Sequence, residues 1–321
     1  MRWKPLRLIP DDTQIHFMKL SRFGFFASGI LASIAICLFV FKGLNYGIDF
    51  KGGSEIAIRT QGPAQLDQLR TELNALGLGS IELQQFGSPQ DVKILVPAQG
   101  GGDANEQAAQ LKVVQALGPT VEVRSKDTVG GKVSEELTQQ ATAAVMLSIF
   151  FVLFYLWVRF EWQFALGAVI SLLHDVILSI GLFSLIGLEF NLSIIAAILT
   201  IIGYSLNDTV VVFDRVREFL RRYKTMNLAD LIDHSINSVL PRTILTSLAT
   251  LLALLALYIF GGEVIRGFSF AMIWGIVVGT YSSIFIASPV LILLGTNREA
   301  STAESRKERR DKREADRKAR R

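Results

Sequence analysis

The chain has 321 residues, of which 50% are hydrophobic and 19% are charged, with a formal net charge of +4. The apolar residues lie in long blocks rather than in short periodic stripes. This excludes an ordinary water-soluble domain and is typical of a polytopic membrane protein. Six blocks are each long enough to cross a hydrocarbon core of about 30 Å as a helix. The predicted spans are 22–41, 140–158, 164–188, 190–213, 243–260 and 267–294.

The chain begins with a basic segment, 1–21, ahead of the first predicted span. A charged start followed by an apolar run is also the pattern of a cleaved signal peptide. This run is longer than a typical signal core and no Ala-x-Ala site follows it, so we expect an uncleaved anchor. The single cysteine, Cys37, lies inside this span, and the exported region is therefore expected to hold no disulfide.

Residues 42–139, between the first two spans, have the composition of a small soluble domain. Apolar alternation, leucine periodicity and Gly/Pro punctuation predict the order β-α-β-β-α-β, which is that of a ferredoxin-like split βαβ fold. The strands are expected at 54–60, 80–86, 91–97 and 120–125, and the helices at 64–76 and 103–117. The charges of this domain are mixed and form no basic stripe, so nucleic acid is not an expected partner.

The third and fourth spans are separated only by Leu188-Glu189, which predicts a tight helical hairpin. The sixth span carries small residues at spacings of four, at Ala271, Gly275, Gly279 and Ser283. Such a ladder lets another helix approach closely, although chance in a Gly- and Ser-rich span is the alternative. The sequence does not indicate which helix packs there.

Lysine and arginine cluster in three segments, 1–21, 214–242 and 295–321, while the turns on the other side are nearly free of them. Six spans place both termini on one side, and the positive-inside rule makes that side the cytosol. The domain 42–139 is then extracytoplasmic. The tail 295–321 mixes acids and bases without large apolar residues, and we interpret it as a topological anchor rather than a lipid-binding segment.

Two acids lie inside predicted spans: Asp175, in the third, and Asp208, in the fourth with Asn207 beside it. A carboxylate at the middle of a span costs about 2.5–3.5 kcal/mol on insertion scales, and it is seldom kept without a task. Because the acids sit on the two arms of one hairpin, they predict a shared polar seam.

Two interpretations of these acids remain open. In the first interpretation, the acids form interhelical hydrogen bonds and do nothing more. In the second, they take up a proton on one side of the membrane and release it on the other. The functional interpretation is favoured for Asp208, the two are even for Asp175, and His174 is taken as structural. Arg242 follows Pro241 at the cytosolic end of the fifth span, where its position alone favours a headgroup anchor over a cation that switches Asp208.

Several stretches together resemble the SecF family of the bacterial SecD/SecF protein-export membrane complex, over nearly the whole chain. They are GIDFKGGSEI (47–56), VGGKVSEEL (129–137), LLHDVI (172–177), GYSLNDTVVVFDRVRE (203–218) and RTILTS (242–247). The resemblance implies a subunit that pairs with SecD in the bacterial cytoplasmic (inner) membrane. The pair assists the SecYEG channel, with YajC and YidC as further partners, and uses the proton-motive force to draw a translocating polypeptide outward.

The resemblance also implies residue roles. Asp208 matches the family's intramembrane acid for proton passage and Arg242 a basic residue that works with it, while the role of Asp175 is less definite. Protons are the coupling ion and no cofactor is implied. The motif residues Gly47, Asp49, Gly52 and Gly53 are interpreted as a hinge or interface. The hypothesis is that protonation of Asp208 changes packing along the seam and tilts the exported domain about the neck 47–54.

Three other functions are alternatives. A half-unit of a proton-driven small-molecule or lipid exporter is the main alternative, although about 100 exported residues enclose little. A purely structural assembly subunit predicts that Asp208→Asn is silent. An enzyme is the weakest candidate, because no nucleophile–base set, phosphate loop or metal-ligand cluster is present and the histidines His16, His174 and His234 are far apart.

Overall fold

The computed structural model describes residues 10, 13–100, 102–119 and 121–295. The basic residues within 1–9 and nearly all of the predicted tail, 295–321, lie outside the described residues. The chain divides into two compact units, one made of 1–43, 148–188 and 196–321, the other of 44–147 and 189–195. Each unit is described by itself.

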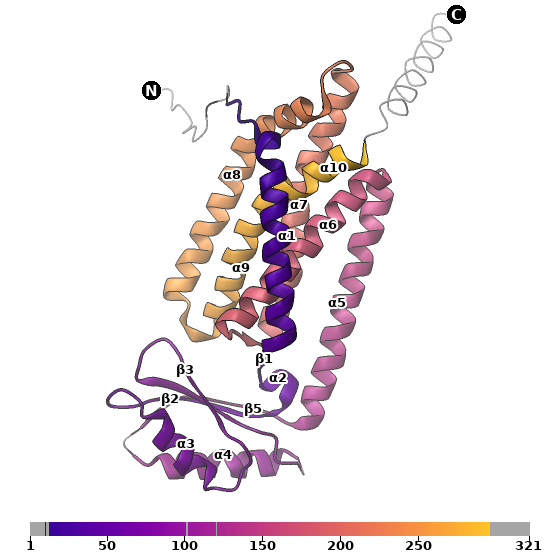
Figure 1. Ribbon diagram of the computed structural model, residues 1–321. Helices are drawn as coiled ribbons and strands as arrows, with labels where there is room; N and C mark the ends of the chain where they lie inside the picture. Colours follow the sequence, from indigo (N-terminus) through magenta and orange to yellow (C-terminus); the bar gives the residue numbers. More distant parts are fainter. Residues whose placement is uncertain (1–9, 11–12, 101, 120, 296–321) are drawn as a thin grey trace, which may run out of the picture. The chain divides into compact units, whose positions relative to one another are not determined.

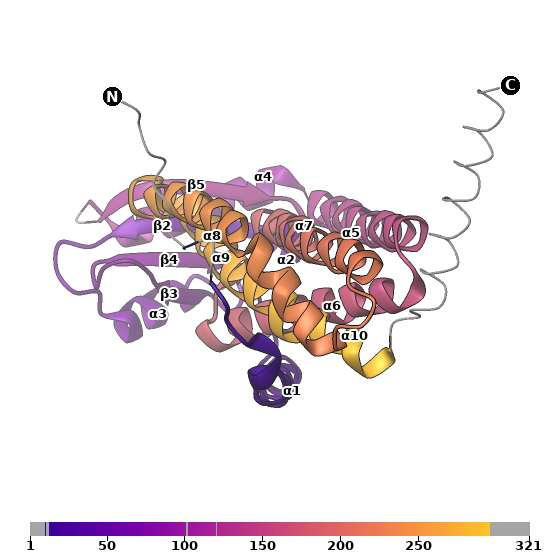
Figure 2. The same cartoon turned by 90° about the horizontal axis from the view of Figure 1, so that it is seen from above.

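The first unit is a helical bundle (Figures 1 and 2). Within the described residues, six helical segments are long and apolar enough to cross a membrane, which confirms the predicted six-span class. They are α1 (Phe17–Lys42), α5 (Gly131–Arg159), α6 (Trp162–Ile186), α7 (Leu192–Arg222), α8 (Leu228–Phe260) and Ile265–Leu294. α1 packs on α6, and α8 packs along α9 (Gly262–Ser282).

The segment predicted as a cytosolic loop, 214–242, is mostly helical. α7 continues to Arg222, and α8 begins at Leu228 after Asn227, whose side chain accepts a hydrogen bond from the Ala229 amide. No glycine or proline interrupts these extensions before Pro241, which lies inside α8. Proline removes one backbone donor from a helix without necessarily ending it.

The last span is not a uniform α-helix. A π-helical turn, η1 (Ser283–Ala287), separates α9 from α10 (Ser288–Leu294). Pro289 explains this, because its ring would clash with the carbonyl four residues earlier in an uninterrupted α-helix. The Ser288 hydroxyl donates a hydrogen bond of 2.9 Å to the Ser283 carbonyl across this turn. π-turns inside helices are frequent at functional sites.

The second unit contains a four-stranded sheet with the order β3-β4-β2-β5. All neighbours are antiparallel, and the elements follow in the predicted order β-α-β-β-α-β. Their bounds are β2 (Gly53–Arg59), α3 (Leu66–Asn74), β3 (Glu82–Gln85), β4 (Asp91–Val96), α4 (Asp103–Leu117) and β5 (Glu122–Val129). Helices α3 and α4 cover one face of this sheet (Figure 1).

The core of the second unit follows from alternation along the central strands. Ile56 and Ile58 of β2 point to the helix-covered face and lie opposite Ile94 and Val92 of β4 in the ladder. All four side chains are fully buried, and together with Val113 of α4 they fill the space between sheet and helices. At about 25 cal/mol per Å² of apolar surface, this burial is the main stabilising term of the domain.

The connection between α6 and α7 is more than a turn. After Gly187, which caps α6 in the left-handed conformation with φ 68°, it forms the short strand β6 (Glu189–Phe190). β6 pairs in parallel with β1 (Asn45–Tyr46), and α2 (Ile48–Lys51) follows β1. β6 and the first residues of α7 therefore belong to the second unit.

Candidate functional site

Asp175 of α6 and Asp208 of α7 are both buried in the helical unit, with exposed fractions of 1% and 3%. Each helix turns one apolar side outward and the side with the acid inward. Burial of an ionisable group at this depth is expensive unless hydrogen bonds or a change of protonation offset it. The surroundings of the two acids differ in this respect.

The Asp175 carboxyl is fully engaged by hydrogen bonds from three helices. Oδ2 accepts from the Ser205 hydroxyl of α7 at 2.6 Å and from the Ser282 hydroxyl of α9 at 2.8 Å. Oδ1 lies 3.0 Å from Nδ1 of His174. The Ser171 hydroxyl donates to Ser282 at 2.9 Å and extends the network on α6. Asp175 is thus the centre of a polar cluster that ties α6 to α7 and α9.

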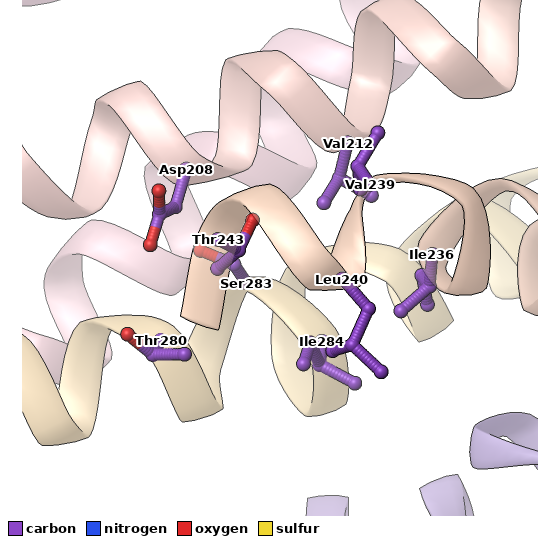
Figure 3. Close-up of a pocket in the computed structure, with 9 residues that line it drawn as sticks. All are labelled: Asp208, Val212, Ile236, Val239, Leu240, Thr243, Thr280, Ser283 and Ile284. Carbon is purple, nitrogen blue, oxygen red and sulfur yellow. The ribbon is translucent and has the colours of Figure 1, made fainter. Parts of the chain in front are cut away.

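The Asp208 carboxyl borders a small cavity instead. It is partly open and has a cavity volume of about 10 Å³. The lining residues come from α7, α8, α9 and η1, and they are Asp208, Val212, Ile236, Val239, Leu240, Thr243, Thr280, Ser283 and Ile284 (Figure 3). Oδ2 of Asp208 is buried and has no hydrogen-bond partner within the described part of the chain. The Asp208 carboxyl therefore keeps one buried, unpaired acceptor beside the cavity, which the Asp175 carboxyl does not.

Arg242 is exposed and is close enough to Asp208 for an electrostatic interaction. Among the described residues, no cation lies within 4 Å of the Asp208 carboxyl, so the two charges do not form an ion pair in this structure. Asn207 is also exposed, on the outer side of α7, and does not line the cavity. The structure therefore brings Arg242 into the neighbourhood of Asp208, and it does not bring Asn207 there.

Hydroxyl groups of the last span lie beside both acids, and sequence reasoning largely missed them. The Thr209 hydroxyl, next to Asp208, lies 2.8 Å from that of Ser283, and Ser282 bonds Asp175. Thr280, one turn earlier on α9, lines the Asp208 cavity and lies 3.2 Å from the Ser247 hydroxyl of α8. The polar run TYSS at 280–283, which ends at the first residue of the π-turn, was the available signal.

The ladder of small residues on the sixth span faces α7. A Cβ at Gly275 would collide with the Ile201 side chain, and one at Gly279 would lie 2.9 Å from Cβ of Ser205. Ala271 is fully buried, and Ser283 bonds Thr209. The last span thus packs on both neighbours: Ser282 reaches Asp175 of α6, and Ser283 reaches Thr209 of α7.

The four motif residues lie in the second unit, three of them before β2 and Gly53 as its first residue. Asp49 Oδ2 accepts a hydrogen bond of 2.9 Å from the Leu192 amide. Gly47 packs against the Glu189 side chain, and its amide donates to the Phe190 carbonyl at 3.0 Å. Gly52 and Gly53 have φ of 69° and 111°, and a Cβ on Gly53 would strike the Val96 carbonyl. These glycines are therefore required for backbone shape and for close approach.

The second unit also holds two charged clusters with perturbed acids. Arg59 donates two hydrogen bonds of 2.7 Å to the Asp91 carboxylate. This contact, together with a hydrogen bond from Ser88, lowers the pKa of Asp91 to about 2. Lys93 Nζ lies 2.7 Å from Glu55 and 2.6 Å from Glu189. Burial and the neighbouring Glu189 charge raise the pKa of Glu55.

Fold and site together define a multi-pass membrane protein with a small α+β domain inserted between its first two spans and two buried acids on adjacent helices. The family model for "Protein export membrane protein SecD/SecF, C-terminal" matches residues 109–297, and that for "SecD/SecF GG Motif" matches 38–64. The chain belongs to the SecD/SecF family and is similar to its SecF subunits.

Individual relatives agree with this assignment. The chain is 43% identical over 300 residues to protein translocase subunit SecF of Rickettsia felis, covering 93% of this chain and 97% of that protein. It is 46% identical over 291 residues to protein translocase subunit SecDF of Brucella abortus, covering 90% of this chain but 38% of that longer protein. The crystal structure of SecDF from Thermus, a translocon-associated membrane protein, matches with a TM-score of 0.81 at 36% identity, covering 90% of this chain and 40% of that one.

Proposed function

We propose that this chain promotes polypeptide export as a SecF-type subunit, in which Asp208 is charged and discharged by protons that cross the membrane. A role in protein export follows from membership of the family. We propose in addition that the proton-motive force supplies the energy and that the subunit acts at a late step, after the ATP-driven phase. Relatives are named as translocase subunits, which is a transport function rather than catalysis.

The observation that carries the proposal is the free, buried oxygen of Asp208 beside a cavity. If the acid served only as structural glue, its oxygens would be saturated, as those of Asp175 are. A carboxyl that keeps an unused acceptor in a span bears a cost of about 2.5–3.5 kcal/mol when ionised, and a proton removes that cost.

The proposed step transfers a single proton through Asp208. The Asp208 carboxylate accepts one proton from the extracytoplasmic side and later releases it to the cytosol, so no net chemistry occurs. One charge that crosses 100 mV releases about 2.3 kcal/mol, and a pH gradient adds to it. Arg242 favours the ionised form when it approaches, and the Thr280 and Ser283 hydroxyls at the cavity are able to bond either form.

The proposed partner is SecD, which the fused SecDF relatives support, since there both parts are one chain. The SecYEG channel, YajC and YidC are proposed as further neighbours, and the translocating polypeptide is the client. The proposed location is the bacterial cytoplasmic membrane, with the chain termini in the cytosol and the α+β domain outside.

The test measures export of a reporter polypeptide into membrane vesicles, with and without an imposed proton-motive force. Asp208→Asn is expected to insert and bind SecD normally and to lose the stimulation by the proton-motive force. Asp214→Asn is the matched control, because it removes a partly exposed acid from the same helix. Full stimulation in Asp208→Asn would contradict the proposal. Co-purification with periplasmic adaptors in place of SecD and SecYEG would favour the small-molecule or lipid exporter.

A further inference from the structure

We propose that the neck of the α+β domain is a rigid joint to the first turn of α7, with Asp49, Lys93 and Glu189 as its positioning residues. The inference rests on the proposed function, because the joint matters only if events at Asp208 are transmitted to the domain. It replaces a flexible glycine hinge by a fixed connection, and it assigns a role to Lys93 and Glu189, which lie outside every motif of the sequence analysis.

The backbone provides the first part of the joint. β1 and β6 pair in parallel, with Asn45 opposite Glu189 and Tyr46 opposite Phe190. The Gly47 amide adds a hydrogen bond of 3.0 Å to the Phe190 carbonyl. The Phe190 ring lies 5.8 Å from that of Tyr46 and 5.9 Å from that of Phe50, so an aromatic cluster covers the ladder. Aromatic pairs at this spacing add about 0.5–1.5 kcal/mol each beyond simple burial.

A charged triad provides the second part. Lys93 of β4 bridges Glu55 of the neighbouring strand β2 and Glu189 of β6. The side chains are mostly buried, with exposed fractions of 23% for Lys93, 12% for Glu55 and 14% for Glu189. Breaking a buried ion pair from one side leaves an uncompensated charge, which is far costlier than breaking an exposed one. Glu189 is the only member that comes from the α6–α7 connection.

The third part is a helix cap. α7 begins at Leu192, and Asp49 Oδ2 accepts a hydrogen bond from the amide of that residue. A carboxylate at a helix N-terminus satisfies an orphan donor and interacts favourably with the helix dipole. A Cβ at Gly47 would lie 2.5 Å from Oε1 of Glu189, so a larger residue there would displace the Glu189 carboxylate. The domain thus holds α7 by its first residue as well as by the strand before it.

The consequence concerns α7 as a lever. It is one unbroken helix from Leu192 to Arg222, and Asp208 lies sixteen residues after its start, about 24 Å at 1.5 Å per residue. A helix transmits axial displacement and rotation over this length, whereas a flexible neck would absorb them. We expect a change of packing around Asp208 to reach this capped end of α7 along the unbroken helix.

The first experiment compares Glu189→Gln with Glu55→Gln in full-length protein assembled with SecD, using the export assay described above. Both remove one carboxylate from the triad, but only the first removes the link between Lys93 and β6. Glu189→Gln is expected to lower the stimulation by the proton-motive force by about fivefold or more, the usual size of a coupling between sites. Glu55→Gln is expected to keep it. Equal effects of the two variants, or no effect of Glu189→Gln, would contradict the proposal of a rigid joint.

A second pair protects the test against misfolding of Glu189→Gln. Asp49→Ala removes the cap of α7, while Asp49→Asn retains an acceptor that caps equally well. We expect Asp49→Ala to lose stimulation and Asp49→Asn to keep it, with unchanged amide exchange in the β2–β4 ladder for both. If Asp49→Asn fails as fully as Asp49→Ala, the cap is not the reason.

A cross-linking experiment distinguishes a rigid joint from a flexible hinge. Tyr46→Cys and Phe190→Cys, in a Cys37→Ser background, place two cysteines at paired positions of β1 and β6. We expect the oxidised protein to keep its stimulation, and the same cross-link to restore stimulation in Glu189→Gln. A block on oxidation that a reductant relieves would show that the neck has to open. Failure of the proposed function itself looks different, because Asp208→Asn would then be silent whatever the joint does.

Discussion

The Ser205 hydroxyl of α7 donates a hydrogen bond of 2.6 Å to Oδ2 of Asp175 on α6. Asp208 lies three residues after Ser205 on α7, and the neighbouring Thr209 bonds Ser283 at 2.8 Å. One acid therefore fixes the hairpin while the other, within a single turn of the fixed point, keeps a free oxygen at a cavity. This difference between the two carboxyls is the geometric basis of the proton-exchange role proposed for Asp208.

The hydrogen bonds to Asp175 predict a measurable loss of stability. Ser205→Ala and Ser282→Ala are each expected to lower the free energy of unfolding by about 1 kcal/mol, since polar contacts inside bilayers average less than those in water-soluble cores. Thermal unfolding in detergent measures this. Ser33→Ala is the control, because that exposed hydroxyl bonds only the Gly29 carbonyl of its own helix. Equal losses at Ser33 and Ser205 would contradict the assignment.

Close packing of α9 on α7 gives a second prediction. Gly275→Leu places a side chain where the Ile201 side chain already lies, and overpacking of this kind costs about 1–3 kcal/mol. Gly203→Leu adds the same side chain to α7 where nothing lies within 4 Å. We expect a lower melting temperature for Gly275→Leu alone. A similar drop in both variants would mean that helix glycines, not this contact, are being measured.

The sequence predicted the six spans and the order of the α+β domain, because both depend on local hydrophobic periodicity. It also picked out Asp175 and Asp208, whose charge stands out in apolar blocks. It did not predict that Ser205 bonds Asp175, since helical spacing gives neighbours on one helix and not contacts across helices. Strand β6 was missed because two residues carry no periodicity, and β5 extends to Val129 through polar residues that suit an exposed edge.

The start of α1 provides a third prediction. Asp233 of α8 accepts a hydrogen bond of 2.9 Å from the Met18 amide, and Asn237 bonds the Ile15 amide and carbonyl at 3.0 and 2.8 Å. Asp233 thus caps a neighbouring helix. Asp233→Ala is expected to cost about 0.5–2 kcal/mol, the usual value of a cap, and to expose the backbone near Ile15 to protease. Asp230→Ala, at an exposed position of the same helix, is expected to leave both measurements unchanged.

Asp91 predicts how the α+β domain responds to acid. Its pKa in the folded protein is lowered to about 2 by Arg59, below the ordinary value of 3.8. An acid with a depressed pKa stabilises the fold above its ordinary pKa, and the contribution is lost as the pH falls through the folded value. Asp91→Asn is therefore expected to weaken amide protection in β4 near neutral pH, with the difference from the parent protein closing between about pH 4 and pH 2. Asp67→Asn, which removes a fully exposed acid, serves as the control.

Glu55 is expected to change the stability of the same sheet with the opposite pH dependence. Burial and the Glu189 charge raise its pKa above the ordinary 4.5, so the folded state favours the protonated form. Its contribution to stability is present at low pH and is lost as the pH rises through the folded pKa. At neutral pH the carboxylate is therefore a cost, and Glu55→Gln is expected to preserve or increase amide protection in β2.

Lys93→Met completes that comparison, because it leaves two buried carboxylates facing each other. It is expected to lower the free energy of unfolding of the domain by about 1–3 kcal/mol, the usual cost of unsatisfied buried groups. Amide exchange of full-length protein in detergent, measured across pH, distinguishes these effects. Loss of protection in Glu55→Gln as large as that in Lys93→Met would mean that Lys93 depends on Glu55 rather than on Glu189, and the ion pair to β6 would then contribute little.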